Sequence, residues 1–187
     1  MIFTETPLRG AFVIELEKRE DSRGFFARSF CRHEFEALGL NPEMAQANVA
    51  FNHRKGTVRG LHFQYPPHGE TKVVRCTKGK MLDVIVDLRP ESPTYLQHFA
   101  VELSAENRRA LYVPDRFAHG YQSLEDATET AYLMGSFFAP GTDGGLHYAD
   151  PRLAIGWPLP VSEISDKDEA CPLLQFSEPE LRRRMAA

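Results

Sequence analysis

Short apolar segments follow one another along most of the chain, and turn-forming residues separate them. The segments are rich in Val, Ile, Leu, Phe, Tyr and Thr, while prolines and glycines gather between them. This pattern predicts β-strands, because β-branched and aromatic side chains suit a pleated sheet and proline cannot donate to a central ladder. The predicted strands cover residues 10–18, 25–30, 58–64, 71–77, 80–88, 97–103, 109–113, 117–124 and 128–135.

Helical patterns are few. Residues 32–38, which Gly39 closes, and residues 178–185 are the two segments predicted to be helical. Many short strands with few helices favour an all-β sandwich or barrel, and a double-sheet jelly roll is the leading candidate. No internal repeat, linker or low-complexity segment divides the sequence, so residues 1–187 are predicted to form a single domain.

Composition narrows the function classes. The net charge of −4 and a pI near 6.0 argue against general affinity for nucleic acids or membrane surfaces, so local basic residues must meet any anionic ligand. No apolar run approaches the length of a membrane span. The three cysteines, Cys31, Cys76 and Cys171, are odd in number and lack CxxC spacing. A reducing compartment is therefore expected, and the predicted location is cytoplasmic.

His62 is the first candidate for chemistry. Regular strand alternation would place Arg59 and His62 on opposite faces, and Gly60 between them predicts a bulge that re-aims one side chain. A histidine that titrates near neutral pH suits proton abstraction. A half-buried structural histidine is the alternative interpretation of the same residue.

Metal binding is another possible function of His62, because jelly-roll proteins often hold metals. Such sites use two histidines two residues apart, a carboxylate further on and a histidine from a later strand. Here the pair reads His62-Phe63-Gln64, which leaves Glu70 and His119 as the other ligands. Zinc or iron sites need three or four well-placed protein ligands, so the sequence predicts no metal site.

Three further residues carry chemistry of the right kind. Lys72 is either a solvated charge or, facing into a barrel, a cation for a developing oxyanion. Tyr132 either packs or supplies a proton opposite a histidine base. Asp168 lies in an acidic, loop-like segment that reads as a solvated turn, unless its carboxylate pairs with His62 and fixes the imidazole tautomer.

Taken together, the motifs resemble those of the dTDP-4-dehydrorhamnose 3,5-epimerase family of the cupin superfamily. The resemblance extends over nearly the whole chain, and the order and spacing of its segments are more specific than any one of them. The matching segments are residues 21–26, 46–48, 55–64, 72–76, 83–89, 103–107, 117–120, 150–151 and 165–168.

The resemblance implies a cupin-type jelly roll that assembles as a homodimer with exchanged N-terminal strands. It implies an isomerase that inverts C3 and C5 of a nucleotide-linked 4-keto-6-deoxyhexose through a C4 enolate, without a cofactor or metal. The substrate would be dTDP-4-dehydro-6-deoxy-D-glucose and the product dTDP-4-dehydro-L-rhamnose.

The resemblance also implies roles for individual residues. His62 would be the base, Asp168 its orienting partner, Tyr132 the acid on the opposite face, and Lys72 the cation beside the enolate oxygen. Arg23 and Phe26 would reach the nucleotide across the dimer. The full set of implied substrate-binding residues is Arg23, Phe26, Gln46, Asn48, Arg59, Lys72, His119, Phe138, Asp143 and Lys167.

Some positions depart from the family pattern, mainly at the nucleotide end. Arg28 stands where the family has glutamate, Phe138 replaces a tyrosine, and Arg116 occupies a position that is usually glycine. Residues 46–56 form a segment one residue longer than usual. These differences leave the base, acid and lysine intact, but the nucleotide and the number of inverted carbons stay open. The alternatives are an epimerase of C3 or C5 alone, another nucleotide sugar, a 3,4-ketoisomerase, a non-catalytic sugar-binding protein and a metal-dependent oxygenase.

Overall fold

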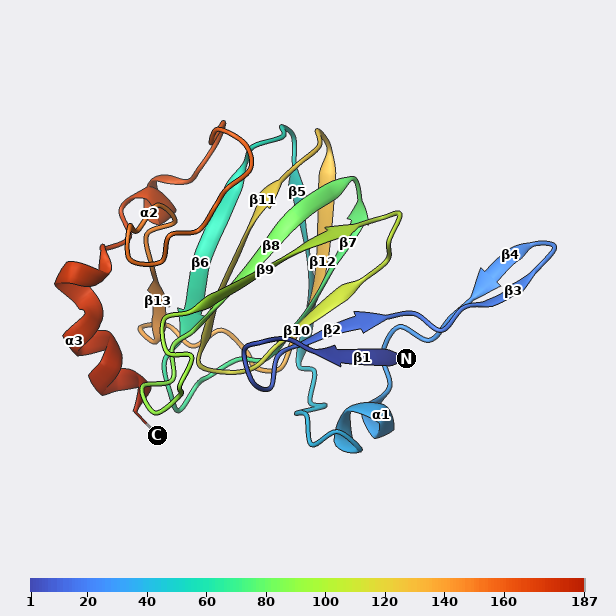
Figure 1. Cartoon of the computed structure of the whole chain (residues 1–187), viewed down its shortest axis with the longest axis horizontal. Coiled ribbons are helices and arrows are strands. Elements are labelled where there is room, and N and C mark those ends of the chain that lie inside the picture. The colour runs from blue at the N-terminus through green and yellow to red at the C-terminus, as the bar shows by residue number, and fades with distance from the viewer. Residues whose placement is uncertain (187) are drawn as a thin grey trace.

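Two antiparallel β-sheets that face each other make up the body of the computed structural model, which describes residues 1–186 (Figure 1). The six-stranded sheet has the order β1 (Ile2–Glu5), β2 (Phe12–Glu15), β10 (Ala110–Val113), β7 (Lys72–Lys78), β12 (Thr128–Met134), β5 (Gln46–Asn52). The five-stranded sheet has the order β13 (Asp143–Gly145), β6 (Val58–Gln64), β11 (Phe117–Ser123), β8 (Lys80–Asp87), β9 (His98–Ser104). Successive strands from β5 to β8 and from β9 to β13 alternate between the sheets, which is jelly-roll connectivity.

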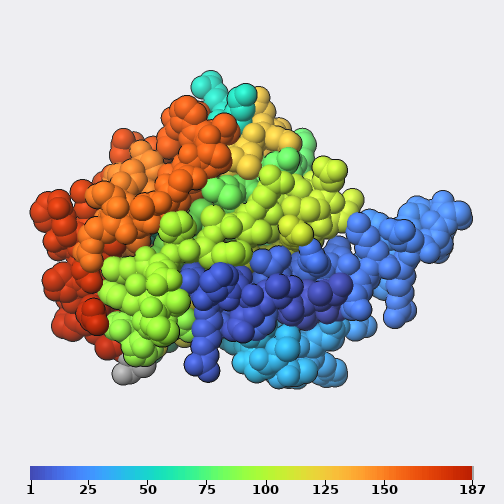
Figure 2. Space-filling view, in the orientation of Figure 1, coloured from blue at the N-terminus to red at the C-terminus, as the bar shows by residue number. Residues whose placement is uncertain are grey.

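A separate hairpin of β3 (Arg19–Asp21) and β4 (Gly24–Phe26) projects from this body, and we call residues 19–26 the arm (Figure 1, Figure 2). The helices are α1 (Arg32–Glu36), α2 (Asp166–Glu169) and α3 (Leu174–Met185). Among residues 1–186, no helix is long and apolar enough to span a bilayer. The prediction of an all-β fold with a few short helices is confirmed.

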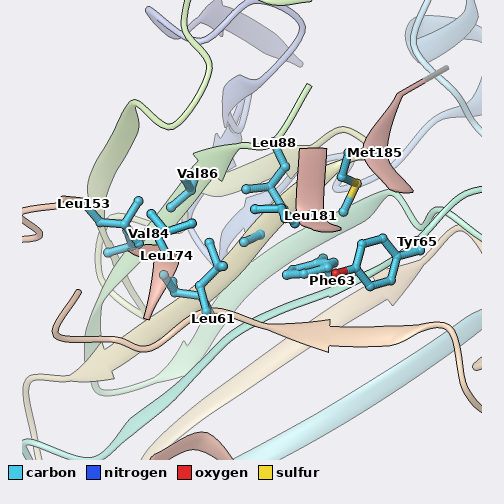
Figure 3. Close-up of a cluster of buried hydrophobic side chains, with 12 residues drawn as sticks. Leu61, Phe63, Tyr65, Val84, Val86, Leu88, Leu153, Leu174, Leu181 and Met185 are labelled. Carbon is cyan, nitrogen blue, oxygen red and sulfur yellow. The ribbon is translucent and has the colours of Figure 1, made fainter. Parts of the chain in front are cut away.

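Apolar clusters lie on both sides of the five-stranded sheet. On its outer face, side chains of β6 and β8 pack against Leu174, Leu181 and Met185 of α3 (Figure 3). Between the two sheets, a second cluster joins residues of β7 and β10 to residues of β8, β9 and β11. A third cluster buries Phe35 of α1 against the six-stranded sheet. The space between the sheets is therefore filled with apolar side chains over only part of its extent.

Several elements differ from the sequence prediction. The segments at 10–18 and 25–30 form only the short strands β2 and β4, and β1, β3, β5 and β13 were not predicted. The interior-facing positions of β5 explain its omission, because Gln46 and Asn48 face a pocket rather than an apolar core. The strand therefore lacks the apolar alternation on which the prediction depends.

The C-terminal helices were also misread. Residues 166–169, interpreted as loop-like, form α2, where the Ser165 hydroxyl accepts a hydrogen bond from the Asp168 amide. Helix α3 begins at Leu174 rather than at residue 178 and continues through Pro179. Its first amide donates to the buried carboxylate of Asp150 at 2.6 Å. Because Asp150 lies 24 residues before Leu174, no local sequence pattern predicts that α3 begins there.

Candidate active site

A pocket of about 1140 Å³ opens between the two sheets. Strands β5, β7 and β12 of one sheet and strands β6, β11 and β13 of the other contribute side chains to its wall, and residues 161–169 complete it. This volume slightly exceeds the usual range for small-molecule sites. The pocket wall carries histidines, lysines, an arginine and carboxylates, whereas the remaining space between the sheets is apolar.

A bulge in β6 brings Arg59 and His62 to the same face. In the register with β11, His62 pairs with His119 and Arg59 pairs with Tyr121. Arg59 and His62 are three residues apart on β6, whereas their partners are two residues apart on β11. The prediction of a bulge at Gly60 is thereby confirmed, and both Arg59 and His62 line the pocket. Gly60 has φ +107°, and a Cβ there would lie 2.6 Å from the backbone of Gly120, so only glycine fits.

His62 pairs with Asp168, as the sequence suggested. The distance from Nε2 to Oδ1 is 2.7 Å, and the His62 side chain is 43% exposed while that of Asp168 is 5% exposed. The second oxygen of Asp168 accepts the Gly60 amide at 3.0 Å. Burial alone would raise the pKa of Asp168, but the hydrogen bonds from His62 and the Gly60 amide outweigh it and lower that pKa. The carboxylate is therefore ionised beside the imidazole at neutral pH.

A second histidine–aspartate pair lies next to the first. His119, the cross-strand neighbour of His62, places Nε2 at 2.7 Å from Oδ1 of Asp83 on β8. The His119 side chain is 10% exposed and that of Asp83 is fully buried. Within the described residues, Oδ2 of Asp83 has no hydrogen-bond partner. The imidazole of His119 is thus held in place from behind while its edge faces the pocket.

Lys72 and Tyr132 lie on neighbouring strands of the opposite sheet. The Lys72 ammonium forms an ion pair with Glu70 at 2.8 Å, and both side chains are at most 10% exposed. Strands β7 and β12 pair Lys72 with Met134 and Val74 with Tyr132, which places Lys72 and Tyr132 on one face. An imidazole thus approaches the pocket from one sheet, and an ammonium and a phenol approach it from the other.

Comparison with known proteins identifies the family. The family model for dTDP-4-dehydrorhamnose 3,5-epimerase matches residues 5–175. The chain belongs to this family. It is accordingly an enzyme of the isomerase class with the cupin-type jelly roll of the family, and the resemblance stated from the motifs is confirmed.

Individual relatives of this epimerase family support the assignment. A dTDP-4-dehydrorhamnose 3,5-epimerase of Salmonella typhimurium is 39% identical over 176 residues, which cover 93% of this chain and 96% of the relative. A dTDP-4-dehydrorhamnose 3-epimerase of Streptomyces niveus is 38% identical over 168 residues, 89% of this chain and 81% of the relative. The crystal structure of a Legionella pneumophila 3,5-epimerase in complex with dTDP-4-keto-L-rhamnose superposes with a TM-score of 0.88, at 37% identity and 96% coverage of both chains.

Most residues predicted from the sequence meet in this one pocket. The predicted residues that line it are His62, Tyr132, Asp168, Lys72, Gln46, Asn48, Arg59, His119, Phe138, Asp143 and Lys167. Arg23 and Phe26 are not among the lining residues of their own chain, because they belong to the arm, where the Phe26 side chain is 72% exposed. The family resemblance implies that these two residues act on a partner subunit.

Two hydrogen bonds hold the Arg59 side chain in place. Its Nε donates to Asn52 at 2.8 Å and its Nη2 to the Phe51 carbonyl at 3.2 Å. Within residues 1–186, no carboxylate lies within ion-pair distance of Arg59, so its charge is available to a ligand. Asn52 also hydrogen-bonds Tyr121, and burial raises the pKa of the Tyr121 hydroxyl.

The mouth of the pocket carries a second cationic group. Lys167 forms an ion pair with Asp143 at 2.9 Å, and this contact raises the pKa of Lys167 and lowers that of Asp143. Phe138 also belongs to the pocket wall and is 62% exposed. Its aromatic face offers a surface on which a planar ring could stack.

Two of the departures from the family pattern have structural explanations. Arg28 is a surface arginine that pairs with Glu34 of α1 at 3.1 Å. Arg116 has φ +60°, the left-handed region that favours glycine, and its guanidinium pairs with Glu91 at 2.7 Å. The ion pair offsets part of the backbone cost that a glycine would avoid.

Sequence reasoning missed the partners that hold the reactive groups. Asp83 lies in one of the matching motifs, but its pairing with His119 depends on cross-strand register. Asn52 was not singled out because its strand was not predicted. Glu70 was considered only as a metal ligand, and its pairing with Lys72 was missed. The three side chains considered as metal ligands, those of His62, Glu70 and His119, are each bonded to another side chain. Among the described residues, no three His, Cys, Asp or Glu side chains are grouped as a metal site.

Proposed function

We propose that this chain inverts C3 and C5 of dTDP-4-dehydro-6-deoxy-D-glucose and releases dTDP-4-dehydro-L-rhamnose. The observation that carries the proposal is the half-exposed His62–Asp168 pair, which faces a pocket shared with Lys72 and Tyr132. The related Legionella structure, which holds dTDP-4-keto-L-rhamnose, supports the choice of sugar and nucleotide.

Proton removal is assigned to His62. Its Nε2–H is directed at the Asp168 carboxylate, so the neutral ring keeps its lone pair on Nδ1. The C4 ketone of the substrate acidifies the C–H bonds at C3 and C5. When Nδ1 takes one of these protons, the electron pair moves into a C3–C4 or C4–C5 double bond and the charge moves to O4. Asp168 stabilises the imidazolium that results.

The enolate is stabilised and reprotonated from the other sheet. The Lys72 ammonium lies beside O4 and balances the charge that develops there. Tyr132 gives its hydroxyl proton to the same carbon from the face opposite His62, which inverts that centre. Solvent then reprotonates the phenolate and takes the proton from His62. A second cycle at the other carbon adjacent to C4 completes the double inversion, and no net oxidation occurs.

Binding of the nucleotide diphosphate is assigned to the cationic and aromatic groups. Arg59, which has no acidic partner in the described part of the chain, and His119 contact the diphosphate or the sugar. Lys167 and Asp143 at the mouth, with Phe138, receive the base, and Gln46 and Asn48 line the floor of the pocket.

We further propose that the enzyme is a homodimer in which the arm serves the partner subunit. The arm projects from the body (Figure 2). The side chains of Arg23 and Phe26 are exposed to solvent in the single chain. An exposed aromatic residue next to an exposed arginine suits contact with a base and a phosphate. Deletion of residues 19–26 is expected to weaken dTDP binding while the sandwich stays folded. Sedimentation of the wild-type protein would show whether it forms the dimer.

The decisive experiment is incubation with dTDP-4-dehydro-6-deoxy-D-glucose in D₂O, followed by NMR. Deuterium at both C3 and C5, together with the L-sugar product, supports the double epimerase. Folded protein that introduces no deuterium at either carbon would exclude this substrate.

Inversion at C3 alone is the second candidate. The Streptomyces niveus relative, a 3-epimerase, is as similar to this chain as the Salmonella typhimurium 3,5-epimerase. The same D₂O experiment separates the two candidates, because label confined to C3 identifies the single epimerase.

We also propose a cytoplasmic location. Cys31, Cys76 and Cys171 are all free thiols, and unpaired cysteines are typical of reducing compartments. Fractionation of the source cells, with detection by an antibody, tests this location.

A further inference from the structure

Glu70 is the residue that fixes the Lys72 ammonium. Nζ of Lys72 lies 2.8 Å from Oε1 of Glu70, and the two side chains are 8% and 10% exposed. Among residues 1–186, Glu70 is the one acid within ion-pair distance of Lys72. A buried ammonium is costly to desolvate unless a carboxylate faces it. The position of the Lys72 charge within the pocket therefore depends on Glu70.

The other oxygen of Glu70 is engaged by Gln64. The Gln64 side chain is buried, and its Nε2 donates to Oε2 of Glu70 at 3.2 Å. Its Oε1 accepts the Ala139 amide at 2.7 Å, and its Nε2 lies 3.1 Å from the His68 carbonyl and 3.3 Å from the Phe137 carbonyl. Since the Ala139 amide requires an oxygen, the carboxamide has one orientation, with its NH₂ group toward Glu70. Gln64 thus joins Glu70 to residues 137–139, which include Phe138.

We infer that Glu70 is a positioning residue, which holds the Lys72 ammonium at the enolate oxygen and connects it through Gln64 to the segment carrying Phe138. This inference rests on the proposed function, because it assigns the enolate oxygen to Lys72. Glu70 acts through Lys72 rather than on the substrate. The end of the pocket that binds the base and the end that stabilises the enolate are thereby parts of one hydrogen-bonded network.

Two effects of Glu70 oppose each other. Its negative charge offsets part of the positive charge that Lys72 offers to the enolate, which slows the reaction. Its hydrogen-bonded position keeps the ammonium from turning toward water, which speeds the reaction. Misplacement by an ångström can cost about 100-fold in rate, so the positioning effect dominates. Removal of the carboxylate should therefore slow the enzyme rather than accelerate it.

The test replaces Glu70 by glutamine, which retains an oxygen for Gln64 but removes the charge. We expect Glu70→Gln to lower kcat and deuterium exchange by about 10- to 100-fold, while KM changes by less than about threefold. In a Lys72→Met background, the same substitution should have no further effect, because Glu70 acts through Lys72. Glu91→Gln, which breaks the ion pair with Arg116 outside the pocket, is the matched control and should leave activity unchanged.

A readout without substrate tests whether Glu70 holds the Lys72 ammonium, separately from the reaction. The Lys72 ammonium should give a persistent ¹⁵N-detected NH₃⁺ signal in NMR, because a buried ion pair slows the exchange of its protons. This signal should disappear in Glu70→Gln and persist in Glu91→Gln. Its persistence in Glu70→Gln, or exchange rates there equal to those of the wild type, would overturn the inference. If the wild-type protein labels no sugar, the proposed function fails, and the ammonium signal alone decides the role of Glu70.

Discussion

Two histidine–aspartate pairs line the same pocket, and they differ in burial rather than in bond length. Both join Nε2 to Oδ1 at 2.7 Å. The His62 side chain is 43% exposed and the His119 side chain is 10% exposed. Asp168 has partners for both oxygens, whereas Oδ2 of Asp83 has none among residues 1–186.

The difference shows how one pairing serves two purposes. An imidazole open to the pocket can approach a C–H bond and later lose its proton to solvent, so the His62 pair suits proton transfer. The His119 pair is fixed on two central strands, β11 and β8, and suits a hydrogen bond of constant direction to the ligand. Substitutions in the first pair should therefore change the rate, and substitutions in the second should change stability and binding.

The largest expected effect comes from His62→Ala. Loss of the base should lower deuterium exchange at every substrate carbon by about 10⁴-fold, the upper range for general-base catalysis. Asp168, whose side chain is 5% exposed, loses the imidazole but keeps the Gly60 amide, so the melting temperature should fall by about 2–4 °C. NMR of the sugar in D₂O and a thermal melt of the same sample measure both. Exchange near the wild-type rate would exclude His62 as the base.

Asp168→Asn should reduce the rate by about 10³-fold, because an amide neither stabilises the imidazolium nor maintains the same tautomer. The measurement is kcat/KM with the same substrate. Ser165→Ala is a useful comparison, since it removes only the hydroxyl that caps α2. An Asp168→Asn enzyme within tenfold of the wild type would show that the pair is structural, like that of His119.

Tyr132→Phe should separate two steps that the wild type performs together. Without the phenol, His62 still removes and returns the proton, so exchange should continue while inversion falls by about 100-fold. Comparing the deuterium content with the fraction of inverted sugar gives the ratio of exchange to inversion. Equal slowing of exchange and inversion would contradict the role of Tyr132 as the acid on the opposite face.

Asp83→Ala tests the buried pair. It leaves the His119 ring N–H without a partner in a site of low exposure, which should lower the free energy of unfolding by about 1–2 kcal/mol. Exchange at saturating substrate should fall less than tenfold, since His119 moves no proton in the proposed mechanism. Urea unfolding and the D₂O assay decide between the two effects. A loss of exchange as large as that of Asp168→Asn would make the two pairs equivalent.

The smallest effect concerns pH. The folded pKa of Asp168 is lower than the unfolded value of 3.8, so the carboxylate adds stability above that value and loses it as pH falls through the folded pKa. The difference in unfolding free energy between wild type and Asp168→Asn should decrease as pH falls below 3.8. Urea unfolding at a series of acidic pH values measures this difference. A difference that stayed constant below pH 3.8 would contradict the lowered pKa of Asp168.

The fold class depends on local signals, because apolar strands separated by turn residues predicted the sandwich. The family resemblance implied most of the predicted residues that line the pocket, and their roles stay predictions. Strand β5 was missed because its inner positions are polar, which is the consequence of lining a pocket. The four residues of α2 were missed because so short a helix has no periodicity, although Ser165 three residues before Asp168 is a capping signal.

The partners of the reactive groups could not be predicted in the same way. Asp83 reaches His119 through the register of β8 with β11, and Glu70 reaches Lys72 through the shape of the loop before β7. Neither register nor loop shape is encoded in a short motif. The arm shows a further limit, because the surroundings of Arg23 and Phe26 depend on a second chain in the proposed dimer.

The bulge at Gly60 restricts how this sequence can change during evolution. Arg59 and His62 share a face only because β6 contains one residue more than β11 between their cross-strand partners. A deletion or insertion between them would turn one of the two side chains away from the ligand, even if every amino acid with chemical function were retained. Outward-facing positions of β6, which pack against α3, can still exchange one apolar residue for another of similar volume. The number of residues between Arg59 and His62 cannot vary.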